Sequence, residues 1–191
     1  MTTKRIDPKK VITGKHTVFS YLFVNTPKEP LGGGEPKYSA SLIIPKSDII
    51  TIQKIQAAIQ AAYDEGQAKL KGTSKSVPPL SNIKTPLRDG DADRPDDAVY
   101  ANSYFINANN RSKPGCVDAD RNPILDPNEL YSGIIGRASI SFYTYNHGGN
   151  RGIACSLNNI QKLADGAPLN GRSRAEDDFA DLDDDDDDFL S

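Results

Sequence analysis

Apolar and polar residues alternate with a period of two over much of this 191-residue chain, and only one segment has helical spacing. Alternation is typical of a strand with one buried face, whereas a helix repeats its apolar residues every three or four positions. The clearest alternation is GRASISFYTYN at 136–146, in which one face carries Ala138, Ile140, Phe142 and Thr144. A parallel sheet covered by helices on both sides is excluded, because each of its crossovers usually needs a helix.

Other strand-like runs surround the helical segment. They are HTVFSYLFV (16–24), KYSASLIIP (37–45), VYANSYFINAN (99–109), the short pair Cys116-Val117, and GIACSLNNIQKL (152–163). The helix begins after Ser47 or Asp48, either of which can cap it, and ends near residues 66–72. Residues 72–97 are rich in Ser, Pro, Gly and Asp and predict an irregular connection. The pattern predicts a mainly β fold, either a small antiparallel barrel or a sandwich.

Charge divides the chain into two segments. Residues 176–191 contain ten acidic residues and no basic one, which leaves 16 acidic against 23 basic residues in 1–175, a net charge of +7. A run of like charges repels itself and buries little apolar surface, so we expect one domain over 1–175 and a disordered acidic tail over 176–191. The positive body attracts polyanions, nucleic acid first among them, and the tail has the sign to compete for the same surface.

The cysteines and the N-terminus indicate the compartment. Cys116 and Cys155 have no paired spacing, and no apolar run opens the chain, so neither a disulfide framework nor a signal peptide is expected. No stretch approaches the length of a membrane span. We therefore expect a cytoplasmic protein without a membrane partner.

Aromatic residues on polar strand faces are candidate DNA contacts. Tyr143 and Tyr145 share one strand face with Ser139 and Ser141, and Phe105 shares a face with Ser103 and Asn107. An exposed ring stacks on any unpaired base and contributes about 1–3 kcal/mol per base, whereas a duplex hides its base faces. The alternative is that these rings are ordinary surface aromatics or are covered by a loop.

Basic residues are interleaved with these aromatics at strand ends and in loops. Lys37 precedes Tyr38, and the others are Arg111, Lys113, Arg121, Arg137 and Arg151. Each alone is most often a solvated surface charge. Together they would follow a phosphate backbone, and binding would then weaken steeply with salt.

Signals for a metal or a catalytic site are weak. The only histidines are His16 and His147, and the two cysteines lack zinc-site spacing. The acidic residues of 89–97 are local to one loop, and LGGGEP lacks the Gly-Lys-Ser/Thr ending of a phosphate-binding loop. We expect no metal, no cofactor and no enzymatic activity.

Three segments, KYSASLIIPK, YFINANNRSKPG and GIACSLNNIQKLADGAPL, resemble a family of phage-encoded single-stranded DNA-binding proteins. The likeness spans about residues 10–170 and is carried by strand and turn patterns. It implies an OB-fold-like antiparallel barrel with one main α-helix, long loops and an acidic C-terminal tail. By this resemblance, DNA lies across the sheet face and is gripped by aromatic residues and basic loops.

The residues predicted to contact DNA on these grounds are Lys37, Tyr38, Phe105, Arg111, Lys113, Arg137, Tyr143, Tyr145 and Arg151. The tail is expected to recruit replication or recombination proteins in the bacterial host cytoplasm through Asp183, Asp184, Asp185, Asp186, Asp187, Asp188, Phe189 and Leu190. Familiar versions of such tails end on Phe, whereas Leu190 and Ser191 follow Phe189 here. A homodimer that exchanges tails is compatible with the sequence.

Three other functions stay open at this point. One is a protein-interaction or chaperone module that uses its acidic tail and binds no DNA, and another is a metal-dependent nuclease. The third is a duplex-binding architectural protein, which is disfavoured because neither a recognition helix nor an arginine-rich arm is evident.

Overall fold

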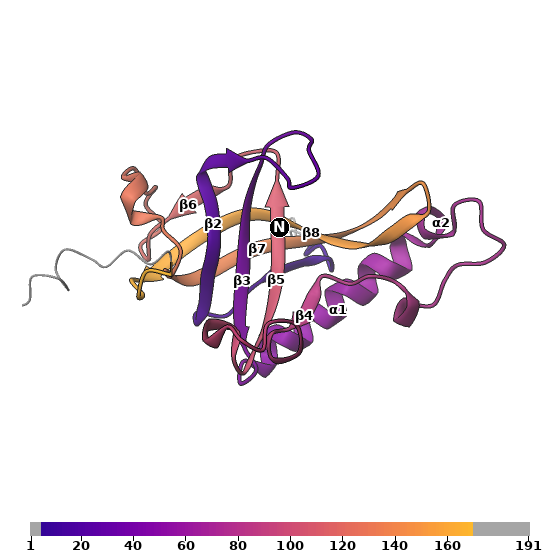
Figure 1. Cartoon of the computed structure of the whole chain (residues 1–191), viewed down its shortest axis with the longest axis horizontal. Coiled ribbons are helices and arrows are strands. Elements are labelled where there is room, and N and C mark those ends of the chain that lie inside the picture. The colour runs from indigo at the N-terminus through magenta and orange to yellow at the C-terminus, as the bar shows by residue number, and fades with distance from the viewer. Residues whose placement is uncertain (1–4, 170–191) are drawn as a thin grey trace, which may run out of the picture.

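The computed structural model describes residues 5–169, and its main feature is a sheet of eight strands (Figure 1). The strands are β1 (Lys10–Ile12), β2 (Thr17–Lys28), β3 (Lys37–Pro45), β4 (Leu87–Asp89), β5 (Ser103–Asn110), β6 (Gly115–Val117), β7 (Ile135–His147) and β8 (Asn150–Ala164). The helices are α1 (Ile49–Glu65), α2 (Gln67–Lys71) and α3 (Gly90–Asp93), with 3-10 turns at Leu80–Asn82, Ala98–Tyr100 and Pro127–Glu129.

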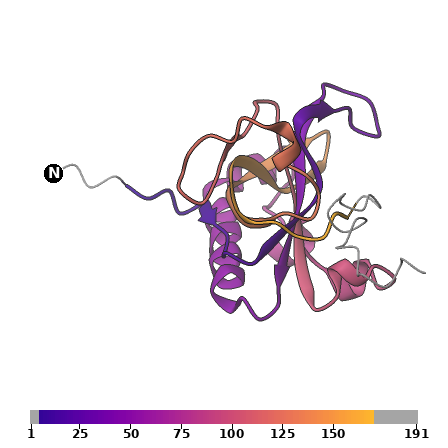
Figure 2. The ribbon, with the colours of Figure 1, turned by 90° about the vertical axis from the view of Figure 1, so that its left-hand side faces the viewer.

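Five of these strands close a ring, which Figure 2 shows nearly end-on. Antiparallel pairs join β7 to β2, β2 to β3, β3 to β5, and β8 to β7. The fifth junction, β5 to β8, is a single parallel pair of Asn109 with Ser156. Beside it, the Asn110 side-chain amide donates to the Leu157 carbonyl at 3.1 Å and to the Ser156 hydroxyl at 3.3 Å. The ring is OB-like and confirms the predicted mainly β fold.

The alternating residues place the core inside the ring. On β8, Ile153, Cys155 and Leu157 are buried, as their alternation predicts. On β7 the predicted Ala138, Ile140, Phe142 and Thr144 are buried. Because burying one large apolar side chain stabilises a fold by about 1.5–3 kcal/mol, this inner face fixes the register of the β7–β8 hairpin.

Helix α1 follows β3 and packs on β1 and β7. The Asp48 side chain accepts a hydrogen bond from the Thr51 backbone N–H at 3.2 Å, so Asp48 is the cap. Ile55 and Ile59 are buried in the same cluster as the inner residues of the ring. The predicted helix and its end near Gly66 are confirmed.

The connection between α2 and β5 was expected to be irregular over 72–97, but it contains β4, which pairs with β5, and the short helix α3. It also covers part of the sheet. Tyr100, from the 3-10 turn, packs with Ile43 and Phe105 in a second small core on the outer side of β3 and β5. This segment therefore covers the outer face of β3 and β5 around Ile43 and Phe105.

The predicted acidic tail over 176–191 lies outside the described residues. Within residues 5–169, no helix combines the length and apolarity needed to cross a bilayer.

Candidate nucleic-acid interface

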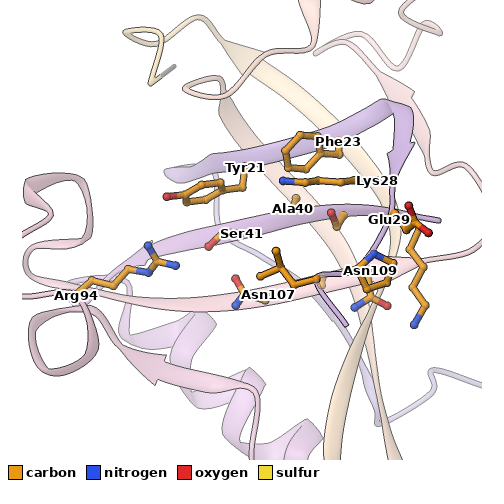
Figure 3. A pocket seen from close by; sticks show the side chains of 14 residues that line it. Tyr21, Phe23, Lys28, Glu29, Ala40, Ser41, Arg94, Asn107 and Asn109 are labelled. Carbon is orange, nitrogen blue, oxygen red and sulfur yellow. The ribbon is translucent and has the colours of Figure 1, made fainter. Parts of the chain in front are cut away.

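A groove of about 380 Å³ crosses the outer face of β2, β3 and β5 (Figure 3). Tyr21 and Phe23 lie along its β2 side, and Asn107 and Asn109 lie across from them on β5. Its remaining lining residues are Lys28, Glu29, Pro30, Leu31, Lys37, Ser39, Ala40, Ser41, Arg94 and Ala108. Three strands thus present rings, amides and charges to one open surface.

The rings project from an irregular part of β2. The pairing register with β3 shifts between Ser20 and Phe23, and Tyr21 has a φ of 45°. That angle lies in the left-handed region, which is strained for a residue with a side chain and is often found at functional sites. Tyr21 is 49 % exposed and Phe23 is half-buried, so both rings have a face open to the groove.

Three cations line the groove: Lys28, Lys37 and Arg94. The Lys28 ammonium lies 4.6 Å from the centre of the Phe23 ring, and the Arg94 guanidinium lies 5.4 Å from that of Tyr21. No carboxylate among residues 5–169 forms an ion pair with any of the three. Their charges are thus available to an anion, beside rings that can stack.

The segment that carries Arg94 is held by an ion-pair cluster. The Lys46 ammonium contacts the Asp89 carboxylate at 2.9 Å and the Asp91 carboxylate at 2.7 Å. These contacts hold the pKa of both carboxyl groups below their ordinary value. Asp89 and Asp91 are therefore engaged in structural contacts. Among the described residues, no group of three or more potential ligands could hold a metal ion.

Polar side chains form the floor of the groove. The Ser41 hydroxyl accepts a hydrogen bond from the Tyr100 hydroxyl at 3.1 Å. The side-chain amides of Asn107 and Asn109 make no hydrogen bond within the part of the chain that the structure describes. An amide offers both donors and an acceptor, so it can pair with the edge of any base.

The prediction that Phe105 is an exposed ring is wrong. The alternation places it on the outer face, but it is fully buried, because the connection between β4 and β5 covers it. The Tyr100 ring packs edge-on against it, with centroids 5.0 Å apart. The guanidinium of Arg94 lies 5.5 Å from its centre, and that of Arg88 5.0 Å. Phe105 supports the groove and cannot stack on a base.

The other predicted residues divide by location. Lys37 lines the groove, but Tyr38 is half-buried and does not line it. Arg111 is exposed and its Nε lies 3.2 Å from the Glu35 carboxylate, in the loop after β2. Lys113 lines a separate hollow near Cys116.

The predicted residues of the β7–β8 hairpin do not line the groove. Tyr143 is 43 % exposed, and burial raises the pKa of its hydroxyl. Tyr145 stacks on His147, with centroids 6.0 Å apart. Arg137 donates from Nε to the Gln161 side chain at 2.9 Å, and Arg151 donates to the Leu70 carbonyl at 2.7 Å.

Several groove residues were not predicted from the sequence, namely Tyr21, Phe23, Lys28, Arg94, Asn107 and Asn109. The signal for the two rings was their spacing within HTVFSYLFV, where Tyr21 and Phe23 are two positions apart. No sequence signal places Arg94 there, because a loop brings it to the sheet. The predicted partner-binding residues, Asp183 to Leu190, lie outside the described range.

Comparison with solved structures supports the fold. The chain is similar to the single-stranded DNA-binding protein of bacteriophage Enc34 in complex with single-stranded DNA, with a TM-score of 0.70 and 24 % identity over 84 % of this chain and 89 % of that one. It is also similar to gp2.5, a single-stranded DNA-binding protein encoded by bacteriophage T7. That match has a TM-score of 0.55 and 17 % identity over 93 % of this chain and 96 % of the other. At these identities, the likeness shows a shared fold.

Comparison of sequences identifies the family. The chain is 32 % identical to putative protein p50 of Acyrthosiphon pisum secondary endosymbiont phage 1. The alignment extends over 148 residues and covers 76 % of this chain and 78 % of that protein. The profile of the family described as Enterobacter phage Enc34, ssDNA-binding protein, matches residues 9–190. The family is defined by binding and not by a reaction, in agreement with the expectation of a protein that is not an enzyme. The chain therefore belongs to the Enc34 single-stranded DNA-binding protein family of phages.

Proposed function

We propose that this protein binds single-stranded DNA without regard to sequence, in the groove over β2, β3 and β5. The observation that carries the proposal is the juxtaposition of Tyr21 and Phe23 with three cations that have no carboxylate partner within residues 5–169. Stacking on a ring suits any base, and the cations suit the phosphates between them. The family and the structure of its Enc34 member with single-stranded DNA support the same ligand.

A titration across a salt series tests this proposal. A fluorescent oligo-dT is titrated with the protein, and a duplex of the same length is the control. Three phosphate contacts predict that the logarithm of the affinity falls with the logarithm of salt with a slope of about −2. The proposal is rejected if the duplex binds as tightly as the single strand, or if neither binds in dilute buffer. The second result would favour a protein-interaction module.

We further propose that the acidic tail competes with DNA for this groove. The backbone N–H of Leu169 donates to the Ser132 carbonyl at 2.9 Å, and Leu169 lines a hollow together with Tyr21 and Phe23. The acidic segment thus follows a residue that lies beside the rings of the groove. Tethering gives it a high effective concentration there, so it acts as a phosphate mimic until DNA displaces it.

A deletion of residues 176–191 tests the competition. It removes ten negative charges and no residue that the structure describes, so it should tighten oligo-dT binding most at low salt. An unchanged affinity at low salt would reject self-competition.

The released tail would recruit replication or recombination proteins in the host cytoplasm. Its acidic run and its Phe189-Leu190 end give a partner both charge and apolar surface to bind. Affinity capture of host and phage proteins by the full chain, with and without bound DNA, checks this role. Capture that ignores both DNA and the deletion of the tail would contradict it.

A further inference from the structure

A second hollow, of about 270 Å³, lies where β1 and β6 flank β7 and β8. It shares no lining residue with the DNA groove. Its apolar lining comprises Ile12, Val117, Ala138 and Ile160, and its basic lining comprises Lys10, Arg121 and Arg137. We call it the Arg137 pocket.

One glutamine bonds to the Arg137 side chain and to the turn that carries Arg121. The Arg137 Nε donates to the Gln161 side-chain oxygen at 2.9 Å. The Gln161 side-chain nitrogen donates in turn to the backbone carbonyls of Asp118 and Ala119, at 3.3 Å and 3.2 Å. These carbonyls belong to the turn that carries Arg121, and both Arg121 and Arg137 line the pocket.

Nothing in the described part of the chain neutralises these charges. No carboxylate there forms an ion pair with Lys10, Arg121 or Arg137. The nearby Asp118 carboxylate instead accepts the backbone N–H groups of Asp120 and Asn122, each at 2.9 Å. The pocket therefore favours an anion.

The apolar lining narrows the class of anion. Ile12 is 47 % exposed, and no aromatic ring of residues 5–169 lines the pocket. A DNA strand would find phosphate partners here but no platform for its bases. A peptide with carboxylates next to an apolar side chain would contact both the basic and the apolar lining residues of the pocket.

We infer that the Arg137 pocket binds the acidic end of its own chain, residues 183–190. That segment is six aspartates followed by Phe189 and Leu190. The aspartates would pair with the three cations of the pocket, and the two apolar side chains would pack on its aliphatic residues. The 20 residue-to-residue steps from Leu169 to Phe189 can extend at most about 70 Å. A domain of this size has a radius of gyration of about 15 Å, so the pocket is within reach. The inference rests on the proposed function only in that DNA in the groove frees the tail for this second site.

A peptide titration tests the inference. The receiver is the chain that lacks residues 176–191, saturated with oligo-dT, so that neither its own tail nor the groove competes. The probe is a fluorescent peptide of residues 176–191, and its anisotropy should rise and saturate. Arg137→Gln and Ile12→Ser in the receiver should each weaken binding about fivefold or more. Lys54→Gln, which removes an exposed lysine of α1 outside the pocket, is the matched control and should change nothing.

A second peptide separates specific binding from charge attraction. It carries Phe189→Ser and Leu190→Ser and keeps all ten acidic residues, and it should bind about tenfold more weakly. Equal binding of the two peptides, or binding that ignores Arg137→Gln and Ile12→Ser, overturns the inference. So does an Ile12→Ser receiver that loses affinity for oligo-dT but not for the peptide, because the pocket would then be part of the DNA path. Failure of oligo-dT to bind at all counts against the proposed function alone, since the peptide is titrated against the pocket variants without DNA as well.

Discussion

Tyr21 and Tyr143 form a matched pair that tests where DNA binds. Their exposed fractions are similar, 49 % and 43 %, but only Tyr21 lines the groove. If one base stacks on Tyr21, Tyr21→Ala removes about 1–3 kcal/mol of binding free energy, a 5- to 160-fold loss of affinity. Tyr143→Ala should change the affinity less than twofold if DNA stays within the groove.

The backbone of Tyr21 allows folding and binding to be separated. Its φ of 45° costs on the order of 1 kcal/mol for a residue with a side chain and nothing for glycine. Tyr21→Gly should therefore be about 1 kcal/mol more stable than Tyr21→Ala, although both variants lose the ring and bind DNA equally weakly. Loss of binding in both thus reports the missing ring and not a damaged fold.

The assay is fluorescence anisotropy with oligo-dT at several salt concentrations, together with urea unfolding of each variant. The salt slope should be the same for Tyr21→Ala as for the unaltered protein, because the ring carries no charge. Lys28→Gln should reduce the slope by about 0.7. The reasoning is refuted if Tyr143→Ala weakens binding more than Tyr21→Ala does.

Three further predictions concern contacts that hold the fold. Phe105→Ala should destabilise the fold by about 3–5 kcal/mol, because it leaves a cavity beside Tyr100, and urea unfolding measures this loss. Asp89 and Asp91 have lowered pKa values, so the stability that they contribute is present above about pH 4 and is lost as the pH falls through those values. The double substitution Asp89→Asn and Asp91→Asn should lower the free energy of unfolding at pH 7 and make it depend less on pH in acid. Urea unfolding at pH 7 and pH 3 measures both effects. Arg151→Gln should speed amide exchange in α2 by removing a bond to its backbone, with no change in oligo-dT affinity; unchanged exchange would contradict the structural role.

The sequence predicted the inner residues of the fold better than the outer ones. Inside the ring, burial follows from alternation alone, and Ile140 and Leu157 lie where the period of two places them. Outside it, exposure depends on what covers the sheet. Phe105 lies on the predicted face but is buried by residues of an irregular loop, and no local pattern specifies where such a loop packs.

The candidate site was predicted only in part for the same reason. Lys37 was correctly placed on the sheet surface, but Arg94 reaches the groove from a loop whose position depends on the Lys46 ion pairs. Tyr21 is exposed because of a register shift in β2 that a single sequence does not reveal. Arg137 and Arg151 have polar partners in the fold, and the charge count alone cannot tell such residues from free cations.

The junction between β5 and β8 has the fewest paired residues of the five in the ring, and the Asn110 amide takes the place of part of a backbone ladder there. Local opening of the closed ring therefore requires the least free energy at this junction. Its amide protons should exchange with solvent before those of the β7–β8 hairpin. Asn109 belongs both to this junction and to the groove. A ligand in the groove that needs Asn109 in place would slow that opening, so occupancy of the groove would be recorded as slower exchange of the backbone amides at this junction.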